Sequence, residues 1–137
     1  MTRYAALALS FLMLPLITAC MGDETVGRYG AAGRVWQLTE LDGATFTSRA
    51  TLTFPEPGKI AGQAPCNLYF GTMAAPYPWF RAEKIGATAM ACSELSQETA
   101  FLRALEQMTL SEVSGDRLIL SNEQGREMVF TAVKPGV

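Results

Sequence analysis

A single apolar run at the N-terminus limits how much of this chain is available for a folded domain. The run extends from Ala5 to Ile17 and follows the cation of Arg3. As a helix its 13 residues would span roughly 20 Å, which is shorter than the ~30 Å hydrocarbon core of a bilayer. This pattern is typical of a secretory signal peptide over residues 1–19 rather than of a membrane-spanning helix. The 118 residues that remain suffice for one domain with a modest core.

The residues that end this run resemble the bacterial lipobox. Ile17, Thr18 and Ala19 place one aliphatic and two small side chains before Cys20. The resemblance implies that the Cys20 thiol receives a diacylglyceryl group and that cleavage makes Cys20 the first residue of a lipoprotein. Because Met21 rather than Asp follows, the resemblance also implies an outer-membrane protein of the cell envelope that faces the periplasm. The alternative is an ordinary signal peptide in which Cys20 has no such role.

The stretch that follows the cysteine is rich in glycine and in small or polar side chains. It offers too few apolar residues to form a core, which predicts a flexible tether over residues 20–33. Gly27, Gly30 and Gly33 do not have the spacing of a dinucleotide-binding loop, and no strand precedes them. The folded domain is therefore expected over residues 34–137.

This domain is expected to be mainly β with one helix, an α+β fold. Short runs of β-branched and aromatic residues between turn signals predict strands over 35–41, 51–54, 59–63, 79–85, 110–113, 117–120 and 127–133. Apolar residues spaced three and four apart predict a helix over 94–108, capped by Ser93 or Ser96, and residues 64–80 are expected to be mostly loop. The last three strands favour an antiparallel meander. We therefore expect a curled antiparallel sheet, partly barrel-like, with one α-helix packed on it.

The composition excludes several kinds of chemistry. The chain contains no histidine, which removes the Ser-His-Asp and Cys-His catalytic arrangements and the commonest metal ligand. Without the signal peptide, 10 basic and 13 acidic side chains remain with no long run of either sign, which does not suit binding to nucleic acid. Glu94 and Glu98 share a helix face, and we expect both to be solvated. We therefore predict no enzyme activity, no cofactor and no metal site.

Cys66 and Cys92 are the two cysteines that remain once Cys20 is acylated. In a small domain exported to an oxidising compartment, such a pair predicts a disulfide. Closing a loop of about 27 residues would stabilise the domain by at most about 3.5 kcal/mol in the chain-entropy treatment. Two free buried thiols or a redox-active pair are the alternatives.

Both of these cysteines lie in segments that resemble signatures of the META domain (HslJ-like) family. Residues 65–71, Pro-Cys-Asn-Leu-Tyr-Phe-Gly, are similar to its G-C-N-x-Y-x-G signature, and residues 88–92, Thr-Ala-Met-Ala-Cys, to its T-x-M-A-C signature. The clear departure is Pro65, where the family usually has glycine, because proline cannot adopt a positive φ. The resemblance extends from Val35 to Val133. It implies a small β-rich domain, periplasmic or lipid-anchored, associated with heat shock, antibiotic tolerance or envelope stress, with no catalytic residue to carry over.

The motif side chains are expected to maintain the fold, with a ligand site as the alternative. Asn67 suits a turn and Gly71 a tight bend, while the hydroxyl of Tyr69 needs a hydrogen-bond partner. Thr88 and Met90 are expected to pack near the second cysteine of the pair.

Residues 76–80, Pro-Tyr-Pro-Trp-Phe, are the strongest candidate for a contact loop. Prolines that hold aromatic side chains in a loop can present them to a partner. We expect Tyr77 to be the most exposed of the three aromatics and Phe80 to belong to the core. Trp79 is either a second contact residue or the first core residue of the next strand.

These features lead to one principal hypothesis and two alternatives. The principal hypothesis is a non-enzymatic envelope lipoprotein that binds another periplasmic component and contributes to stress or antibiotic tolerance or to envelope integrity. The first alternative is a carrier of a small apolar ligand, which requires a large apolar cavity in the curled sheet. The second is a secreted inhibitor of a hydrolase that presents the 76–80 loop.

The anchor is open to a direct test. Because only a thiol can carry the diacylglyceryl group, Cys20→Ser should abolish metabolic labelling with palmitate and leave an uncleaved precursor. Labelling followed by gel electrophoresis measures both effects. Persistent labelling of the variant would refute the anchor.

Overall fold

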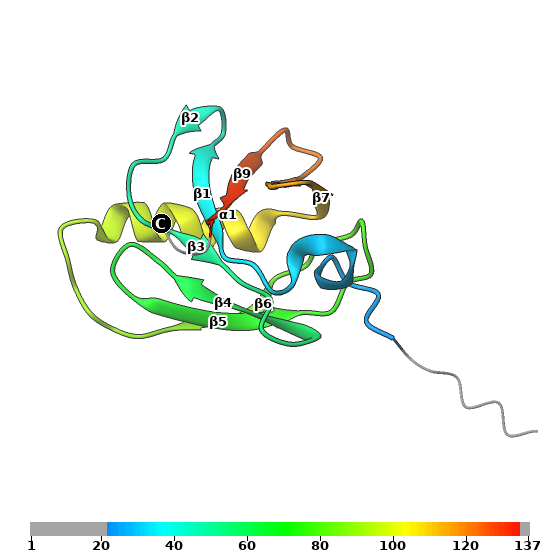
Figure 1. Ribbon diagram of the computed structural model, residues 1–137. Coiled ribbons are helices and arrows are strands. Elements are labelled where there is room, and N and C mark those ends of the chain that lie inside the picture. The colour runs from blue at the N-terminus through cyan, green and yellow to red at the C-terminus, as the bar shows by residue number, and fades with distance from the viewer. Residues whose placement is uncertain (1–21, 135–137) are drawn as a thin grey trace, which may run out of the picture.

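The computed structural model describes residues 22–134 of the chain (Figure 1). One α-helix and nine strands are present there, together with a single helical turn, η1 (Gly27–Ala31). The strands are β1 (Trp36–Leu41), β2 (Ala44–Thr45), β3 (Thr51–Leu52), β4 (Gly58–Gln63), β5 (Leu68–Met73), β6 (Glu83–Ala87), β7 (Leu110–Ser114), β8 (Arg117–Ser121) and β9 (Glu127–Ala132). The helix α1 (Leu95–Gln107) lies between β6 and β7 in the chain.

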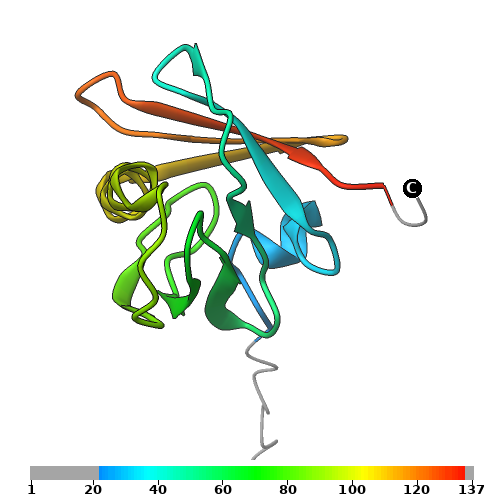
Figure 2. The same ribbon diagram turned by 90° about the vertical axis from the view of Figure 1, so that its left-hand side faces the viewer.

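Two antiparallel sheets make up the domain. The larger has the strand order β2-β1-β9-β8-β7, with β3 also paired to β1, and the smaller has the order β4-β5-β6. A single bridge between Thr53 and Ala61 links the two sheets. Both sheets are curled but they do not close into a barrel (Figure 2). The prediction of a mainly β, α+β fold with one helix is thus confirmed, with two sheets in place of one.

The C-terminal third is the meander that the sequence predicts. Strands β7, β8 and β9 pair in order, and β9 then pairs with β1, so that both ends of the domain meet in one sheet. The Asp42-Gly43 turn after β1 has positive φ at both residues, as a tight hairpin turn requires. The Arg126 side chain donates to the Asp42 carboxylate at 2.7 Å. This hydrogen bond lowers the pKa of Asp42 below its usual value.

The helix lies along one side of the domain, between the two sheets (Figure 2). Phe101 is fully buried there, with its ring centroid 5.5 Å from Tyr69 and 6.5 Å from Phe46. Leu105 is buried on the same face of the helix. The helix is thus held by packing. Neither Ser93 nor Ser96 caps it, because Glu94 occupies the cap position and makes no side-chain cap hydrogen bond.

Strand β5 is the main element that the sequence pattern failed to predict. Residues 64–80 were expected to be mostly loop, yet residues 68–73 form the central strand of the smaller sheet. The prolines that suggested a loop lie outside this strand, and its sequence, Leu-Tyr-Phe-Gly-Thr-Met, does not alternate between apolar and polar side chains. The strand expected over 79–85 is also displaced, because β6 occupies 83–87.

The segment before β1 differs from the flexible tether predicted over residues 20–33. Val26 and Ala31 are fully buried members of the core. The indole of Trp36 donates to the Ala31 carbonyl at 2.9 Å, and the Tyr77 N–H donates to the Glu24 carbonyl at 2.7 Å. Two small apolar side chains and backbone hydrogen bonds are enough to fix this stretch against a core that other segments build. The folded domain therefore begins well before residue 34.

Tyr69 connects the smaller sheet to β3. Its ring is buried against α1, and its hydroxyl donates to the Thr51 carbonyl at 2.6 Å, which supplies the hydrogen-bond partner that a buried phenol needs. Burial raises the pKa of Tyr69 above its usual value near 10, because the charged phenolate would lose its hydration.

Tyr69→Phe is expected to lower the free energy of unfolding at neutral pH by about 1–2 kcal/mol, because the Thr51 carbonyl loses its buried donor. Because the pKa of Tyr69 is higher in the folded state than in the unfolded state, its contribution to the free energy of unfolding is fully present below about pH 10. Above that pH the contribution is lost, by at most about 1.4 kcal/mol per pH unit. In the Tyr69→Phe variant, the free energy of unfolding should therefore fall less steeply as the pH rises above about 10. Urea unfolding at neutral and alkaline pH measures both effects, and an unchanged alkaline slope would contradict the assignment to Tyr69.

Candidate functional site

Asn67 is the centre of a polar cluster at the start of β5. Its carboxamide pairs with the Met90 peptide in both directions: the Met90 N–H donates to Oδ1 at 2.6 Å, and Nδ2 donates to the Met90 carbonyl at 2.9 Å. Oδ1 also accepts the Thr88 hydroxyl at 2.9 Å, and Nδ2 lies 3.1 Å from both carboxylate oxygens of Glu98. The full hydrogen-bonding capacity of the amide is therefore used. An amide resembles a peptide group, so Asn67 extends the β5–β6 pairing beyond the end of β6.

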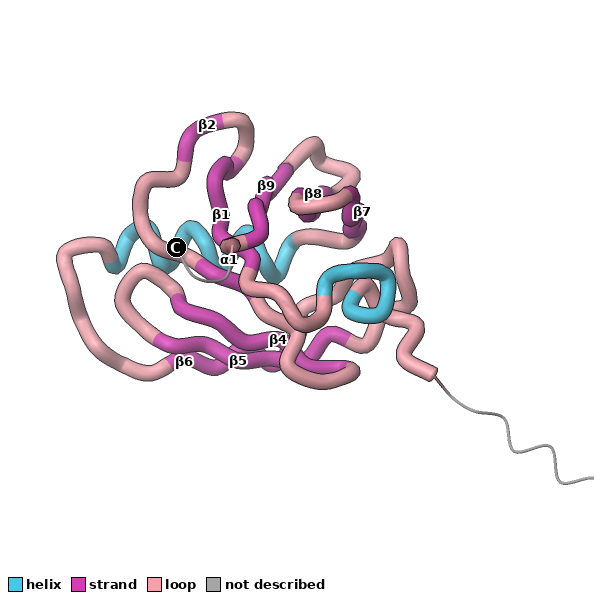
Figure 3. Tube along the Cα trace, in the orientation of Figure 1, coloured by secondary structure: helices cyan, strands magenta, loops and turns pink. Residues whose placement is uncertain are grey.

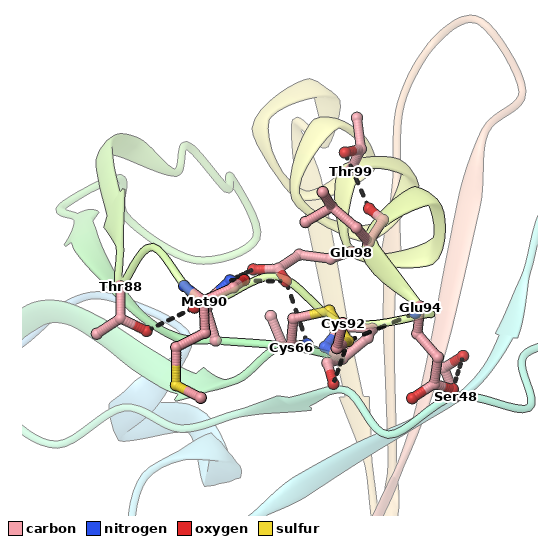
Figure 4. Close-up of a disulfide and its surroundings, with 12 residues drawn as sticks. Ser48, Cys66, Thr88, Met90, Cys92, Glu94, Glu98 and Thr99 are labelled. Carbon is pink, nitrogen blue, oxygen red and sulfur yellow. Dashed lines mark hydrogen bonds between the residues drawn. A yellow bond between two sulfur atoms is a disulfide. The ribbon is translucent and has the colours of Figure 1, made fainter.

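Thr88 and Met90, the motif residues of the second signature, contribute in different ways. The Thr88 hydroxyl donates to Asn67 and also accepts the Leu68 N–H at 3.2 Å, so it joins the two signature segments. Met90 contributes its backbone, whereas its side chain is 69% exposed and points away from the disulfide (Figure 4). The expected packing of the Met90 side chain near Cys92 is therefore wrong. Asn67 also differs from its expected role, since it cross-links segments rather than shaping a turn.

Glu98 is a buried carboxylate, only 4% exposed, that points from α1 into this cluster (Figure 4). It accepts the Cys66 N–H at 3.1 Å in addition to the Asn67 amide. Its place on the helix explains why the prediction of a solvated side chain is wrong. Glu98 lies on the same face as Phe101 and Leu105, which are buried, whereas Glu94 precedes the first turn of the helix, is exposed, and accepts the Ser48 hydroxyl at 2.7 Å.

The predicted disulfide is present between Cys66 and Cys92, with a Cα–Cα distance of 5.7 Å. The bond, drawn in Figure 4, ties the loop before β5 to the loop that runs from β6 to α1, and Figure 3 shows the course of both loops. Cys66 thus holds the cluster twice, once through this bond and once through its N–H to Glu98. Pro65 takes the family's glycine position without a positive φ, since among the described non-glycine residues only Asp42 and Lys84 have one.

Gly71 lies within β5 rather than in the tight bend that was expected. The β5–β6 register shifts between Phe70 and Thr72, so the two strands approach closely at this glycine. A Cβ atom at Gly71 would lie 3.0 Å from the Glu83 carbonyl oxygen and 3.2 Å from the side chain of Ile85. The absence of a side chain is what permits this approach.

The contact loop predicted over residues 76–80 is tied to the edge of the larger sheet. The Pro78 carbonyl accepts the Ser111 N–H at 2.7 Å, and the Phe80 N–H donates to the Thr109 carbonyl at 2.9 Å. Phe80 is buried, as expected, and Trp79 is exposed. Tyr77 is half-buried and stacks on Tyr29 with ring centroids 4.6 Å apart, so it is Trp79, not Tyr77, that the loop presents.

The surface formed by residues 22–134 carries several grooves. One groove of about 360 Å³ lies beside the contact loop, lined by Pro76, Trp79, Arg81 and their neighbours. Within residues 22–134, no group of three or more Cys, Asp or Glu side chains is placed to hold a metal ion. The Glu98 carboxylate is buried, and the Cys66 N–H and the Asn67 amide occupy its oxygens.

Cys20, the predicted site of lipid attachment, lies outside the described residues. None of the helices that the structure describes has both the length and the apolar character needed to cross a bilayer.

The two curled sheets, the single helix and the disulfide-closed polar cluster define a small α+β domain in which Asn67 and Tyr69 are the buried residues of the two signatures. The chain belongs to the META domain family, which its sequence matches over residues 31–135. The family resemblance predicted from residues 65–71 and 88–92 is thereby confirmed. No curated protein matches the chain in sequence.

Solved structures share the fold at low sequence identity. A protein from Burkholderia xenovorans, solved by NMR, is 20% identical with a TM-score of 0.63, and the match covers 90% of this chain and 99% of that one. A DUF4847 family protein from Bacteroides vulgatus is 16% identical with a TM-score of 0.59, over 77% of this chain and 96% of its own. At such identities the likeness establishes the fold alone.

Asn67→Asp should destabilise the domain by about 3 kcal/mol or more, because it removes the donor to two partners and brings a second carboxylate against Glu98. Urea unfolding measures the loss. The chain offers a matched control in its other asparagine, since Asn122 also donates through Nδ2 to a backbone carbonyl, but in an exposed turn. Asn122→Asp should cost less than about 1 kcal/mol.

The double variant Asn67→Asp/Glu98→Gln separates repulsion from the lost donor. The carboxamide introduced by Glu98→Gln can donate to the new carboxylate, so part of the stability should return, with a coupling of roughly 1 kcal/mol or more. The Met90 carbonyl still lacks its donor, so the recovery should be incomplete. Strict additivity of the two substitutions would show that Asn67 and Glu98 do not act as a pair.

Proposed function

We propose that this chain is a non-enzymatic lipoprotein of the cell envelope, held by an acylated Cys20 on the periplasmic face of the outer membrane. Its META domain binds another envelope protein and in this way contributes to stress or antibiotic tolerance or to envelope integrity. The location rests on the signal peptide and lipobox pattern. The binding role rests on the surface of the smaller sheet.

The observation that carries the binding role is an apolar strip formed by Leu68, Phe70 and Met90. These side chains are 57%, 60% and 69% exposed, respectively. Leu68 and Phe70 point to the same outer face of β5, and Met90 is paired through its backbone to the residue before Leu68. The Phe70 ring lies against Gly86, where a Cβ would come within 2.8 Å of it. Grouped exposed apolar side chains are typical of a surface that binds a partner.

The packing of the interior supports a protein binder over a carrier of a small apolar ligand. Trp36, Tyr69, Phe101 and Phe130 fill the space between the sheets and the helix. A carrier would need that space to enclose its ligand. The strip, by contrast, adjoins the cluster around Asn67, because Leu68 follows Asn67 and the Met90 backbone is hydrogen-bonded to its side chain. The surface that carries these side chains therefore need not rearrange on binding.

A photo-crosslinking amino acid at position 70, introduced into the full-length protein in cells, should yield a discrete adduct with another envelope protein. Thr131 provides the matched control position, because it is exposed on a strand of the larger sheet. Leu68→Ser introduced beside the position-70 probe should weaken the adduct without loss of folding, since Leu68 is mostly exposed. If the probe at position 70 gives no adduct that the probe at position 131 does not also give, the strip is not the binding surface.

A further inference from the structure

The chain joins the domain very close to the proposed lipid attachment point. The Glu24 carbonyl accepts the Tyr77 N–H at 2.7 Å, and Val26 is fully buried. Only residues 21–23 therefore lie between Cys20 and the first backbone group that is bound to the rest of the domain.

Covalent geometry limits how far the domain can move from the lipid. Four residues of extended chain span at most about 14 Å, so the Glu24 Cα stays within that distance of the Cys20 Cα. A flexible tether over residues 20–33 would have allowed roughly 45 Å. The headgroup layer of one leaflet is about 5–8 Å thick. The surface around Glu24 must therefore lie at the membrane, and the domain has little freedom to turn it away.

Two exposed aromatic side chains are found at this end of the domain. Trp79 and Tyr29 are each 56% exposed. Tyr29 stacks on Tyr77, whose N–H binds Glu24, and Trp79 follows two residues later in the same loop. A groove of about 340 Å³ lined by Gly22 and Pro76 adjoins the groove lined by Pro76 and Trp79, because the two share Ala74 and Pro76. Tryptophan and tyrosine favour the interface between lipid and water.

The charges around these aromatics do not select an anionic surface. Lys59 lies 3.7 Å from Glu56, and Arg81 lies 3.7 Å from Glu83. Asp23 and Glu24 add negative charge beside the point where the chain leaves the domain, and the Arg28 guanidinium beside Gly22 supplies one positive charge there. Contact through this end would therefore depend on the aromatic side chains and not on attraction to anionic headgroups.

We infer that the end of the domain carrying Tyr29 and Trp79 is a membrane-docking face, which rests on the phospholipid surface to which Cys20 is anchored. This inference rests on the acylation of Cys20 proposed above. Strand β5 runs away from this end, from Met73 beside the groove to Leu68, over roughly 17 Å. The apolar strip is thereby directed toward the periplasm. The docked loop, in turn, is not accessible to a soluble hydrolase, which weighs against the inhibitor hypothesis.

Tryptophan fluorescence provides a direct test, because the chain has only two tryptophans and Trp36 is fully buried. The mature protein is purified from membranes, its acyl chains are confirmed by intact mass, and it is reconstituted into phosphatidylcholine vesicles with lipids brominated near the glycerol. The emission of Trp79 is obtained by subtracting the spectrum of the Trp79→Phe variant from that of the unaltered protein. We expect Trp79 emission to be quenched by the brominated lipid and protected from aqueous acrylamide.

The matched control moves the reporter to the other end of the domain. Leu95 is exposed at the start of α1, opposite the end where the N-terminal segment leaves the domain (Figure 1). The Leu95→Trp reporter in the Trp79→Phe background should show the reverse pattern, with quenching by acrylamide and not by bromine. Equal behaviour of the two reporters on an acylated protein would overturn the docking face alone. A mature chain without acyl mass would overturn the anchor, and the docking face with it.

Discussion

The domain depends on the hydrogen bonds of one buried amide. The Asn67 side chain pairs with the Met90 peptide, accepts the Thr88 hydroxyl and donates to Glu98, so it joins β5, the loop after β6 and the helix α1 at one point. No backbone hydrogen bond of a regular sheet could connect all three. The disulfide from Cys66 closes the same region covalently. The two family signatures therefore meet at the disulfide, where Asn67 and Thr88 contribute side chains and Met90 contributes its backbone.

The burial of the Glu98 carboxylate has an energetic cost, which hydrogen bonds within the cluster offset. A carboxylate loses much hydration on burial, and none of the ion pairs found between residues 22 and 134 involves it. The Cys66 N–H and the Asn67 amide take the place of water. Oε2 accepts from both donors, and Nδ2 of Asn67 also lies 3.1 Å from Oε1, so the carboxylate holds α1 against the start of β5. The rigid frame that results supports the exposed Leu68 and Phe70.

Several elements could be predicted from local sequence because their cause is local. The turns at Asp42-Gly43 and Ser114-Gly115-Asp116, the inward faces of Trp36 and Leu38, and the helical spacing of Phe101 and Leu105 are all present in the structure. Strand β5 was missed because its sequence does not alternate: Leu68 and Phe70 are apolar but exposed, and a glycine stands at position 71, where the neighbouring strand leaves little room for a side chain. The roles of Asn67 and Glu98 were missed for a related reason: residues 31 positions apart in the chain meet only after folding.

The sequence by itself determined the family, the mainly β class and the exclusion of histidine chemistry, and it favoured the Cys66–Cys92 bond, because these follow from residue identity and short-range pattern. Only the tertiary structure decided which polar groups are buried, that Trp79 rather than Tyr77 is exposed, and that the chain is held from Glu24 onward. Residues 24–33 look like a linker because they contain few apolar side chains. They are ordered because Val26, Ala31 and the Glu24 carbonyl meet partners that distant parts of the chain supply.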